Sequence, residues 1–201
     1  MITLGVLISG GGSNLQAIID AVAAGTLDAR IATVISNKEE AYGLERARGA
    51  GIRAVHIDPG AYDSADEYNG ALRDELQTQG VEYVVMAGYM KLLGTQVLDA
   101  FPMRVLNLHP ALLPSFPGAH GIDDALAYGV KVTGITVHFA DEVFDRGPII
   151  AQTAVEVFED DTRDSLAMRI HDAEHKLYPK VLQWIAEEKV AVKGRRVYVR
   201  Q

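Results

Sequence analysis

Short apolar segments rich in β-branched residues alternate along the first half of this chain with longer segments of helical character. Regular alternation of this kind favours parallel strands joined by crossover helices. The sequence therefore predicts an α/β fold with a doubly wound, mostly parallel sheet. The expected strands are residues 4–9, 31–36, 52–57, 81–87 and 105–108, and the expected helices are residues 13–24, 41–50 and 64–79.

The pattern changes after the fifth expected strand. Residues 110–120 contain three prolines and a glycine, which predicts an ordered and functional loop. Residues 133–139 and 148–158 predict two strands joined by an acidic loop, as an antiparallel extension of the sheet. Apolar residues at helical spacing predict a long C-terminal helix over residues 165–188, and residues 197–199 predict a final strand.

Composition excludes several classes of protein. The 201 residues fit one domain, and 48% hydrophobic residues are enough for one sizeable core. The net charge of −8 argues against a nucleic-acid partner, and the absence of cysteine excludes disulfides and thiol nucleophiles. No apolar run approaches the ~18 residues of a membrane span. Residues 1–6 look like a first strand rather than a signal peptide, so we expect a cytoplasmic protein without a membrane partner.

An amide and an imidazole stand together at the end of the fifth expected strand, in the run Asn107-Leu108-His109-Pro110. Alternate side chains of a strand share a face, so Asn107 and His109 point the same way. In open α/β sheets, ligands bind at the carboxyl ends of the strands. His109 can donate or accept a proton near neutral pH, and Asn107 can hold an oxygen that gains negative charge.

A glycine-rich loop joins the first expected strand to the first expected helix. Its sequence is Ser9-Gly10-Gly11-Gly12-Ser13-Asn14. Glycines let backbone N–H groups approach an anion, and a helix N-terminus adds partial positive charge. The loop matches neither the Walker A nor the dinucleotide pattern, so a single phosphate fits best. A tight turn followed by a helix cap from Ser13 or Asn14 is the structural alternative.

Two carboxylates are candidates for the same site. An imidazole that holds a proton at neutral pH needs a carboxylate nearby, and the acidic segment 141–148 offers one. A solvated hairpin tip is the alternative for that segment. Glu174 lies on or beside the apolar stripe of the last helix, where a carboxylate needs a partner. That partner is either an amine of the ligand or an arginine or lysine of this chain.

Metal binding and nucleophilic catalysis have little support. The six histidines form no His-Glu-x-x-His pattern, and no Gly-x-Ser-x-Gly elbow is present. His171 and His175 are four residues apart, but a solvated helix surface explains that spacing better than a metal. We therefore expect no metal.

These motifs together resemble the phosphoribosylglycinamide formyltransferases, which belong to the formyl-folate transferase family. The resemblance covers nearly the whole chain. Asn107-x-His109-Pro110 and the Leu-Leu-Pro that follows are shared by the wider family, whereas the loop at residues 9–14 is specific to this group. The signatures are residues 7–15, 36–38, 43–47, 87–91, 107–114 and 147–150.

The resemblance implies a reaction and a role for each residue. The amine of N1-(5-phosphoribosyl)glycinamide attacks the formyl carbon of 10-formyltetrahydrofolate, and formylglycinamide ribonucleotide and tetrahydrofolate result, as in de novo purine synthesis. Asn107 and His109 stabilise the oxyanion, and Asp145 helps His109 to hold and pass a proton. The substrate-binding residues are Gly12, Ser13, Asn14 and Glu174. The folate-binding residues are Met90, Lys91, Leu92, Leu93, Asn107 and Asp141, with the loop at residues 140–145.

The resemblance also implies one formyltransferase domain over residues 1–201. Residues 1–100 form a Rossmann-like, phosphate-binding half, and residues 101–201 form the catalytic and folate-binding half. The partners are these two small molecules, and the protein is a monomer or a homodimer. The chain departs from its relatives at Ala65, where we expect a folate-contacting arginine.

Two alternatives remain. In a formyltetrahydrofolate hydrolase, water replaces the amine; that group usually carries a regulatory domain before the catalytic one, and here residue 1 leads directly into the first strand. A non-catalytic phosphate-binding module would use the glycine loop and leave Asn107 and His109 structural.

Overall fold

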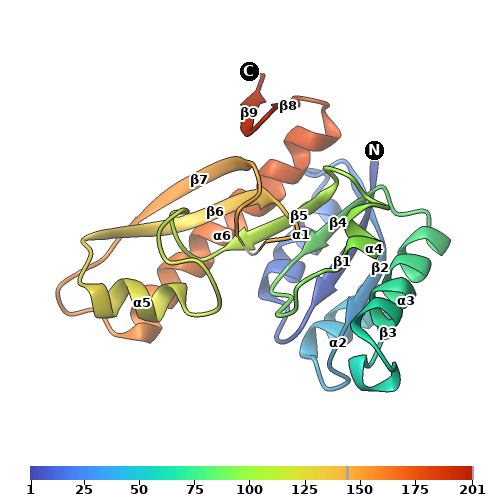
Figure 1. Cartoon of the computed structure of the whole chain (residues 1–201). Helices are drawn as coiled ribbons and strands as arrows, with labels where there is room; N and C mark the ends of the chain where they lie inside the picture. Colours follow the sequence, from blue (N-terminus) through green and yellow to red (C-terminus); the bar gives the residue numbers. More distant parts are fainter. Residues whose placement is uncertain (144, 201) are drawn as a thin grey trace. The chain divides into compact units, whose positions relative to one another are not determined.

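The computed structural model describes residues 1–143 and 145–200, and Phe144 and Gln201 lie outside the described residues. The chain divides into two compact units, Met1–Leu106 and Asn107–Gln201 (Figure 1). The boundary falls inside strand β5 (Val105–His109). The expected single domain with a division at residue 100 stays a prediction.

Unit 1 contains a parallel sheet with the strand order β3-β2-β1-β4. Strand β1 (Ile2–Ile8) pairs in parallel with β2 (Ala29–Ser36) on one side and β4 (Tyr83–Met86) on the other, and β3 (Ala54–His56) pairs with β2. Parallel pairing places the carboxyl ends of all four strands at one edge. The glycine loop follows β1 at that edge.

The helices of unit 1 form two groups. Helix α1 (Ser13–Ala23) contacts α2 (Tyr42–Gly49), and α3 (Ala65–Thr78) contacts α4 (Thr95–Leu98) and the short 3₁₀ helix η1 (Pro59–Ala61). The chain runs outward from β1 to β3 and then returns to β4. Right-handed crossovers therefore place α1 and α2 on one face and α3 on the other, which is the doubly wound arrangement.

The core of unit 1 explains why its strands read as continuous apolar runs. In β1, both the even residues Leu4 and Val6 and the odd residue Leu7 are fully buried. A parallel sheet with helices on both faces buries both sides of each strand, so no alternation with polar residues is needed. The four expected strands of this unit are confirmed, whereas the short helix α4 was not predicted.

In unit 2 the strand order is β5-β6-β7. Strands β6 (Val132–Phe139) and β7 (Ile149–Glu156) are antiparallel, which confirms the expected extension. Their register shifts between Val137 and His138. Such irregularities bend a strand and change the direction of nearby side chains.

The long helix α6 (Arg163–Ala186) packs against β6, β7 and α5 (Gly121–Tyr128). It begins in a capping box, in which the side chain of Thr162 accepts from the Ser165 amide at 3.2 Å. A small antiparallel hairpin of β8 (Val190–Lys193) and β9 (Arg196–Val199) follows. The long helix and the last strand were predicted, whereas α5 and β8 were not.

The proline-rich segment 110–120, all of which is described, contains no helix or strand and is held by side chains of the sheet. The buried hydroxyl of Thr136 donates to the carbonyl of Ala111 at 2.7 Å and accepts from the amide of Leu113 at 3.1 Å. Gln152 donates to the carbonyl of Leu113 at 2.9 Å. These bonds satisfy backbone groups that the irregular path leaves unpaired, so the segment is an ordered loop, as expected.

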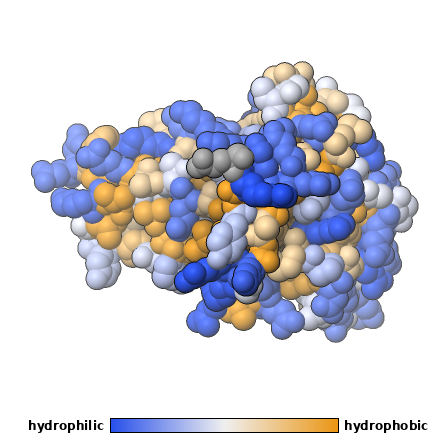
Figure 2. Space-filling view, turned by 90° about the horizontal axis from the view of Figure 1, so that it is seen from above, coloured by the Kyte–Doolittle hydropathy of each residue, from blue (hydrophilic) through white to orange (hydrophobic). Residues whose placement is uncertain are grey.

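Some large hydrophobic side chains remain exposed, among them Met90 and Tyr128. Figure 2 shows one face of the molecule, on which hydrophobic patches lie among hydrophilic residues. Within the described part of the chain, no helix combines the length and the apolar character needed to cross a bilayer.

Replacing Gly134 in β6 by alanine should destabilise the protein. A Cβ atom there would lie 2.1 Å from the carbonyl oxygen of Thr153 and 2.7 Å from Leu112 Cδ2. Overpacking of this kind costs about 1–3 kcal/mol in unfolding free energy. Urea denaturation should show a lower midpoint for Gly134→Ala than for Gly49→Ala, since nothing lies within 4 Å of a Cβ at Gly49. Equal midpoints would contradict this packing.

Candidate functional site

The glycine loop opens helix α1 without a side-chain cap. Gly12 is the N-cap residue, with a left-handed φ of 70°, and it has no side chain that could bond to the first turn. The predicted cap from Ser13 or Asn14 was wrong, because the left-handed turn at Gly12 already places Ser13 inside the helix. The amides of the first turn therefore lack an N-cap side chain, which is the arrangement in which a helix N-terminus receives an anion.

Close packing explains the need for glycine at one end of this loop. A Cβ at Gly12 would lie 2.7 Å from Gly43 Cα, and the Gly43 amide donates to the carbonyl of Gly10 at 3.0 Å. By contrast, Gly10 and Gly11 have no atom within 4 Å of a Cβ. The loop thus packs against the start of α2 at Gly12 and through the Gly10 carbonyl, and only Gly12 lacks room for a side chain.

Arg46 of α2 places a positive charge beside the loop. Its Nε donates to the carbonyl of Gly11 at 2.8 Å, and its Nη1 donates to Gln16 Oε1 at 3.0 Å. These bonds fix a guanidinium next to the loop in a chain of net charge −8. In the sequence, Arg46 stands out only as part of the family signature at residues 43–47. No local pattern indicates that α2 folds back against the loop.

Ser9 connects the ends of three strands in unit 1. Its hydroxyl donates to Asn37 Oδ1 at 2.6 Å, just after β2, and accepts from the amide of Met90 at 2.9 Å, after β4. This bond places the segment 90–93 at the same sheet edge as the glycine loop. Within that segment Met90 is exposed, whereas Leu93 is buried.

Unit 2 brings Asn107, His109 and Asp145 together. Asn107 and His109 lie on one face at the end of β5, as the strand period predicted. His109 Nδ1 lies 3.4 Å from Asp145 Oδ2, and Asn107 Nδ2 lies 3.4 Å from Asp145 Oδ1. Only 4% of the Asp145 side chain is exposed. This part of the acidic segment is therefore a buried cluster and not a solvated hairpin tip.

Both ring nitrogens of His109 face acceptors. Nε2 lies 2.8 Å from the carbonyl oxygen of Phe116, which can only accept, so Nε2 carries a proton. Nδ1 faces the carboxylate of Asp145. An imidazole placed between a carbonyl and a carboxylate is best satisfied as a doubly protonated imidazolium. The geometry therefore suits a proton donor.

The carboxylate of Asp145 is stabilised in its ionised form. Burial by itself would raise its pKa, but the hydrogen bond from the amide of Gly118 and the charge of His109 outweigh burial, and the pKa is lowered. The Gly118 amide donates to Oδ2 at 2.8 Å. The loop at residues 110–120 thus contacts both members of the His109–Asp145 pair, through Phe116 and Gly118.

A second histidine, His138, joins this cluster and was not predicted. Its side chain is 1% exposed, and its Nε2 lies 3.2 Å from Asn107 Nδ2 and 3.6 Å from Asp145 Oδ1. The only signal in the sequence is a histidine flanked by the apolar residues Val137 and Phe139.

Glu174 is buried on α6, as its place beside the apolar stripe predicted, with 4% exposure. Its carboxylate accepts from His171 Nδ1 at 2.9 Å, so this partner is neither an arginine nor a lysine. The hydrogen bond to Glu174 raises the pKa of His171. His171 is therefore a hydrogen-bond donor to this carboxylate.

The remaining candidate, Asp141, lies in the loop at residues 140–145, of which Phe144 lies outside the described residues. The Asp141 carboxylate accepts from the amide of Val143 at 3.0 Å. No group of three histidine, aspartate or glutamate side chains that could hold a metal occurs within residues 1–143 and 145–200.

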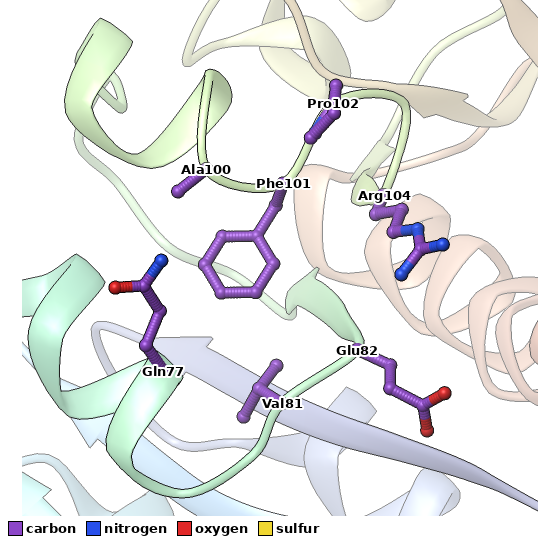
Figure 3. Close-up of a pocket in the computed structure, with 7 residues that line it drawn as sticks. All are labelled: Gln77, Val81, Glu82, Ala100, Phe101, Pro102 and Arg104. Atoms are coloured by element: carbon purple, nitrogen blue, oxygen red, sulfur yellow. The ribbon is translucent and has the colours of Figure 1, made fainter.

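A cavity of about 660 Å³ lies elsewhere in unit 1, where β4 begins (Figure 3). This is the opposite end of the strand from the glycine loop, and the cavity includes none of the predicted site residues. It is lined by Gln77, Val81, Glu82, Ala100, Phe101, Pro102 and Arg104.

Comparison with known proteins agrees with these features. Residues 3–182 match the family model described as formyl transferase. The chain is 42% identical over 182 residues to the phosphoribosylglycinamide formyltransferase of Escherichia coli, which covers 90% of this chain and 86% of that protein. The Bacillus subtilis enzyme of the same name is 41% identical over 89% of this chain and 91% of that protein.

Solved structures show the same likeness. Glycinamide ribonucleotide transformylase 1 from Symbiobacterium toebii superposes with a TM-score of 0.99 at 50% identity, covering all of this chain and 95% of that one. This confirms the predicted fold class. With a family model that spans most of its length, the chain belongs to the formyl transferase family.

Proposed function

We propose that this chain transfers the formyl group of 10-formyltetrahydrofolate to the amine of N1-(5-phosphoribosyl)glycinamide. The products are formylglycinamide ribonucleotide and tetrahydrofolate. The amine nitrogen forms a bond to the formyl carbon, the bond from that carbon to folate N10 breaks, and one proton passes from the amine to N10. The observation that carries the proposal is the buried set of Asn107, His109 and Asp145, in a chain of this family.

The glycine loop is the proposed site for the ribose phosphate. Backbone amides at the start of α1, together with the side chains of Ser13 and Asn14, supply hydrogen-bond donors. Arg46 adds a fixed positive charge. The short span between Ile8 and Ser13 suits one phosphate group better than a diphosphate.

His109 and Asp145 carry the proposed acid–base chemistry. The imidazolium of His109 faces the negative charge that develops on the formyl oxygen and supplies a proton as the tetrahedral intermediate collapses. Asp145 remains ionised, because its neighbours lower its pKa, and it accepts at Nδ1 of His109. No metal is required in this scheme, which depends on positioning and electrostatics.

Glu174 is proposed to meet the glycinamide end of the substrate. Its buried carboxylate, oriented by a hydrogen bond from the His171 ring, is the proposed acceptor for an N–H group of the substrate. The segment 90–93 and the loop at residues 140–145, with Asp141 and Asn107, are proposed to contact the folate. A cytoplasmic location and a monomeric or homodimeric state stay predictions.

Replacing His109 by alanine should lower kcat by about 10²–10⁴-fold, because the proton donor is lost while the binding groups remain. The assay follows the absorbance of the folate product with and without the ribonucleotide. The parent enzyme should turn over only when the ribonucleotide is present. Turnover with water alone would indicate a hydrolase, and full activity of His109→Ala would exclude the proposed chemistry.

Replacing Ser13 and Asn14 together by alanine should raise the KM for the ribonucleotide and leave the KM for the folate nearly unchanged. The substitutions remove contacts to the ribose phosphate, whereas the residues that act on the formyl group remain. An increase of about tenfold or more is expected for two lost hydrogen bonds to a charged group. Equal increases for both substrates would remove the loop from phosphate binding.

Replacing Asp145 by asparagine should lower kcat and change the response of stability to acid. Because the pKa of Asp145 is lowered in the folded protein, its ionised carboxylate stabilises the fold fully above the ordinary pKa of 3.8. That stabilisation is lost as the pH falls through the lowered pKa and the carboxylate takes up a proton. Urea unfolding should therefore show a parent–variant difference that shrinks below about pH 4. A difference that grows on acidification would contradict the assignment.

A further inference from the structure

His138 has two different partners at its two ring nitrogens. Nδ1 lies 2.8 Å from the carbonyl oxygen of Phe139, and Nε2 lies 3.2 Å from the amide nitrogen of Asn107. Asp145 Oδ1 lies 3.6 Å from Nε2, which is beyond hydrogen-bond distance. The residue is fully enclosed, and it follows the register shift between β6 and β7. A polar ring kept in such a place, beside the reacting groups, calls for a reason beyond packing.

The chemistry of these partners determines the state of His138. A carbonyl oxygen only accepts, so Nδ1 must carry the proton. The NH₂ group of Asn107 only donates, so Nε2 must present its lone pair. His138 is therefore a neutral imidazole protonated at Nδ1, in contrast to His109, both of whose nitrogens face acceptors.

The carboxylate of Asp145 fixes the orientation of Asn107 independently of His138, because a carboxylate oxygen only accepts. The amide nitrogen of Asn107 faces two acceptors, His138 Nε2 and Asp145 Oδ1, and the NH₂ group has two hydrogens to give. The opposite orientation would set the amide oxygen against a lone pair and a carboxylate. The donors of Asn107 are thus used inside the cluster, and its oxygen is the atom left for a substrate.

We propose that His138 is a positioning residue that, with Asp145, fixes the Asn107 carboxamide with its oxygen toward the reacting groups. The inference rests on the proposed function and refines it. The Asn107 oxygen accepts a hydrogen bond from the attacking amine and so directs the nitrogen lone pair to the formyl carbon. Stabilisation of the oxyanion then falls to His109, in place of the pair of donors expected from the sequence.

Two substitutions of His138 separate this role from a structural one. In His138→Asn, the shorter amide still reaches the Phe139 carbonyl but has no atom at the Nε2 position. In His138→Gln, the side-chain oxygen can take the place of Nε2 and accept from Asn107. We expect His138→Asn to lower kcat about ten- to hundredfold with little change in either KM. His138→Gln should retain most of kcat. If His138 served only to bond to the Phe139 carbonyl, His138→Asn would instead be the more active of the two variants.

A double-mutant cycle decides the case in which both variants lose activity. If His138 acts through Asn107, His138→Asn should cause little further loss in an Asn107→Ala background, whereas a full additional loss would overturn the proposal. Retention of kcat in His138→Asn would also overturn it.

The protonation state of His138 can also be measured directly, without an activity assay. Long-range ¹H–¹⁵N spectra of the parent protein at neutral pH should show His138 protonated at Nδ1 and unprotonated at Nε2. A proton on Nε2 would overturn the inference even if the enzyme has the proposed activity. Conversely, absence of ribonucleotide-dependent turnover in the parent protein, with this tautomer observed, would reject the proposed function and leave the orientation of Asn107 intact.

Discussion

A buried carboxylate organises the catalytic part of unit 2. A charge that is removed from water must be paired and hydrogen-bonded, or the protein is destabilised by several kcal/mol. Asp145 meets this requirement with two partners from β5, His109 and the NH₂ group of Asn107, and with one from the loop at residues 110–120, the Gly118 amide. The need to satisfy one carboxylate therefore brings together segments that are distant in the sequence, and it places them around the side chain of Asn107.

The two histidines of this cluster have different hydrogen-bond partners and therefore suit different protonation states. His109 faces acceptors at both nitrogens and suits a charged donor, whereas His138 faces one acceptor and one donor and suits a neutral acceptor. Different surroundings can give two side chains of the same type different protonation states. One site can then supply both an acid and a fixed polar partner. In unit 1, the amides at the start of α1 and the Arg46 guanidinium supply positive charge beside the glycine loop. A strongly acidic chain can therefore still offer a local site for an anion.

Much of this arrangement could be predicted from local pattern. Apolar runs rich in β-branched residues identified the strands, the period of two placed Asn107 beside His109, and helical spacing placed Glu174 on the apolar side of α6. The predictions that failed concern contacts between segments. A cap at Ser13 was expected from residue preference, but the left-handed turn at Gly12, packed on Gly43, moves the start of the helix. Arg46 has no local signal and His138 only a weak one, since their roles depend on residues from other segments.

The sequence by itself determined the α/β class, the glycine loop and the chemical types available to the site, because these follow from short-range periodicity and from the properties of single residues. Only the tertiary structure decided which atoms meet. Whether an imidazole donates or accepts, and which end of an amide faces a substrate, depends on partners that the fold brings together from distant segments. For His138 and Asn107 those partners are a carbonyl and a carboxylate, and they fix the direction of every hydrogen bond between them.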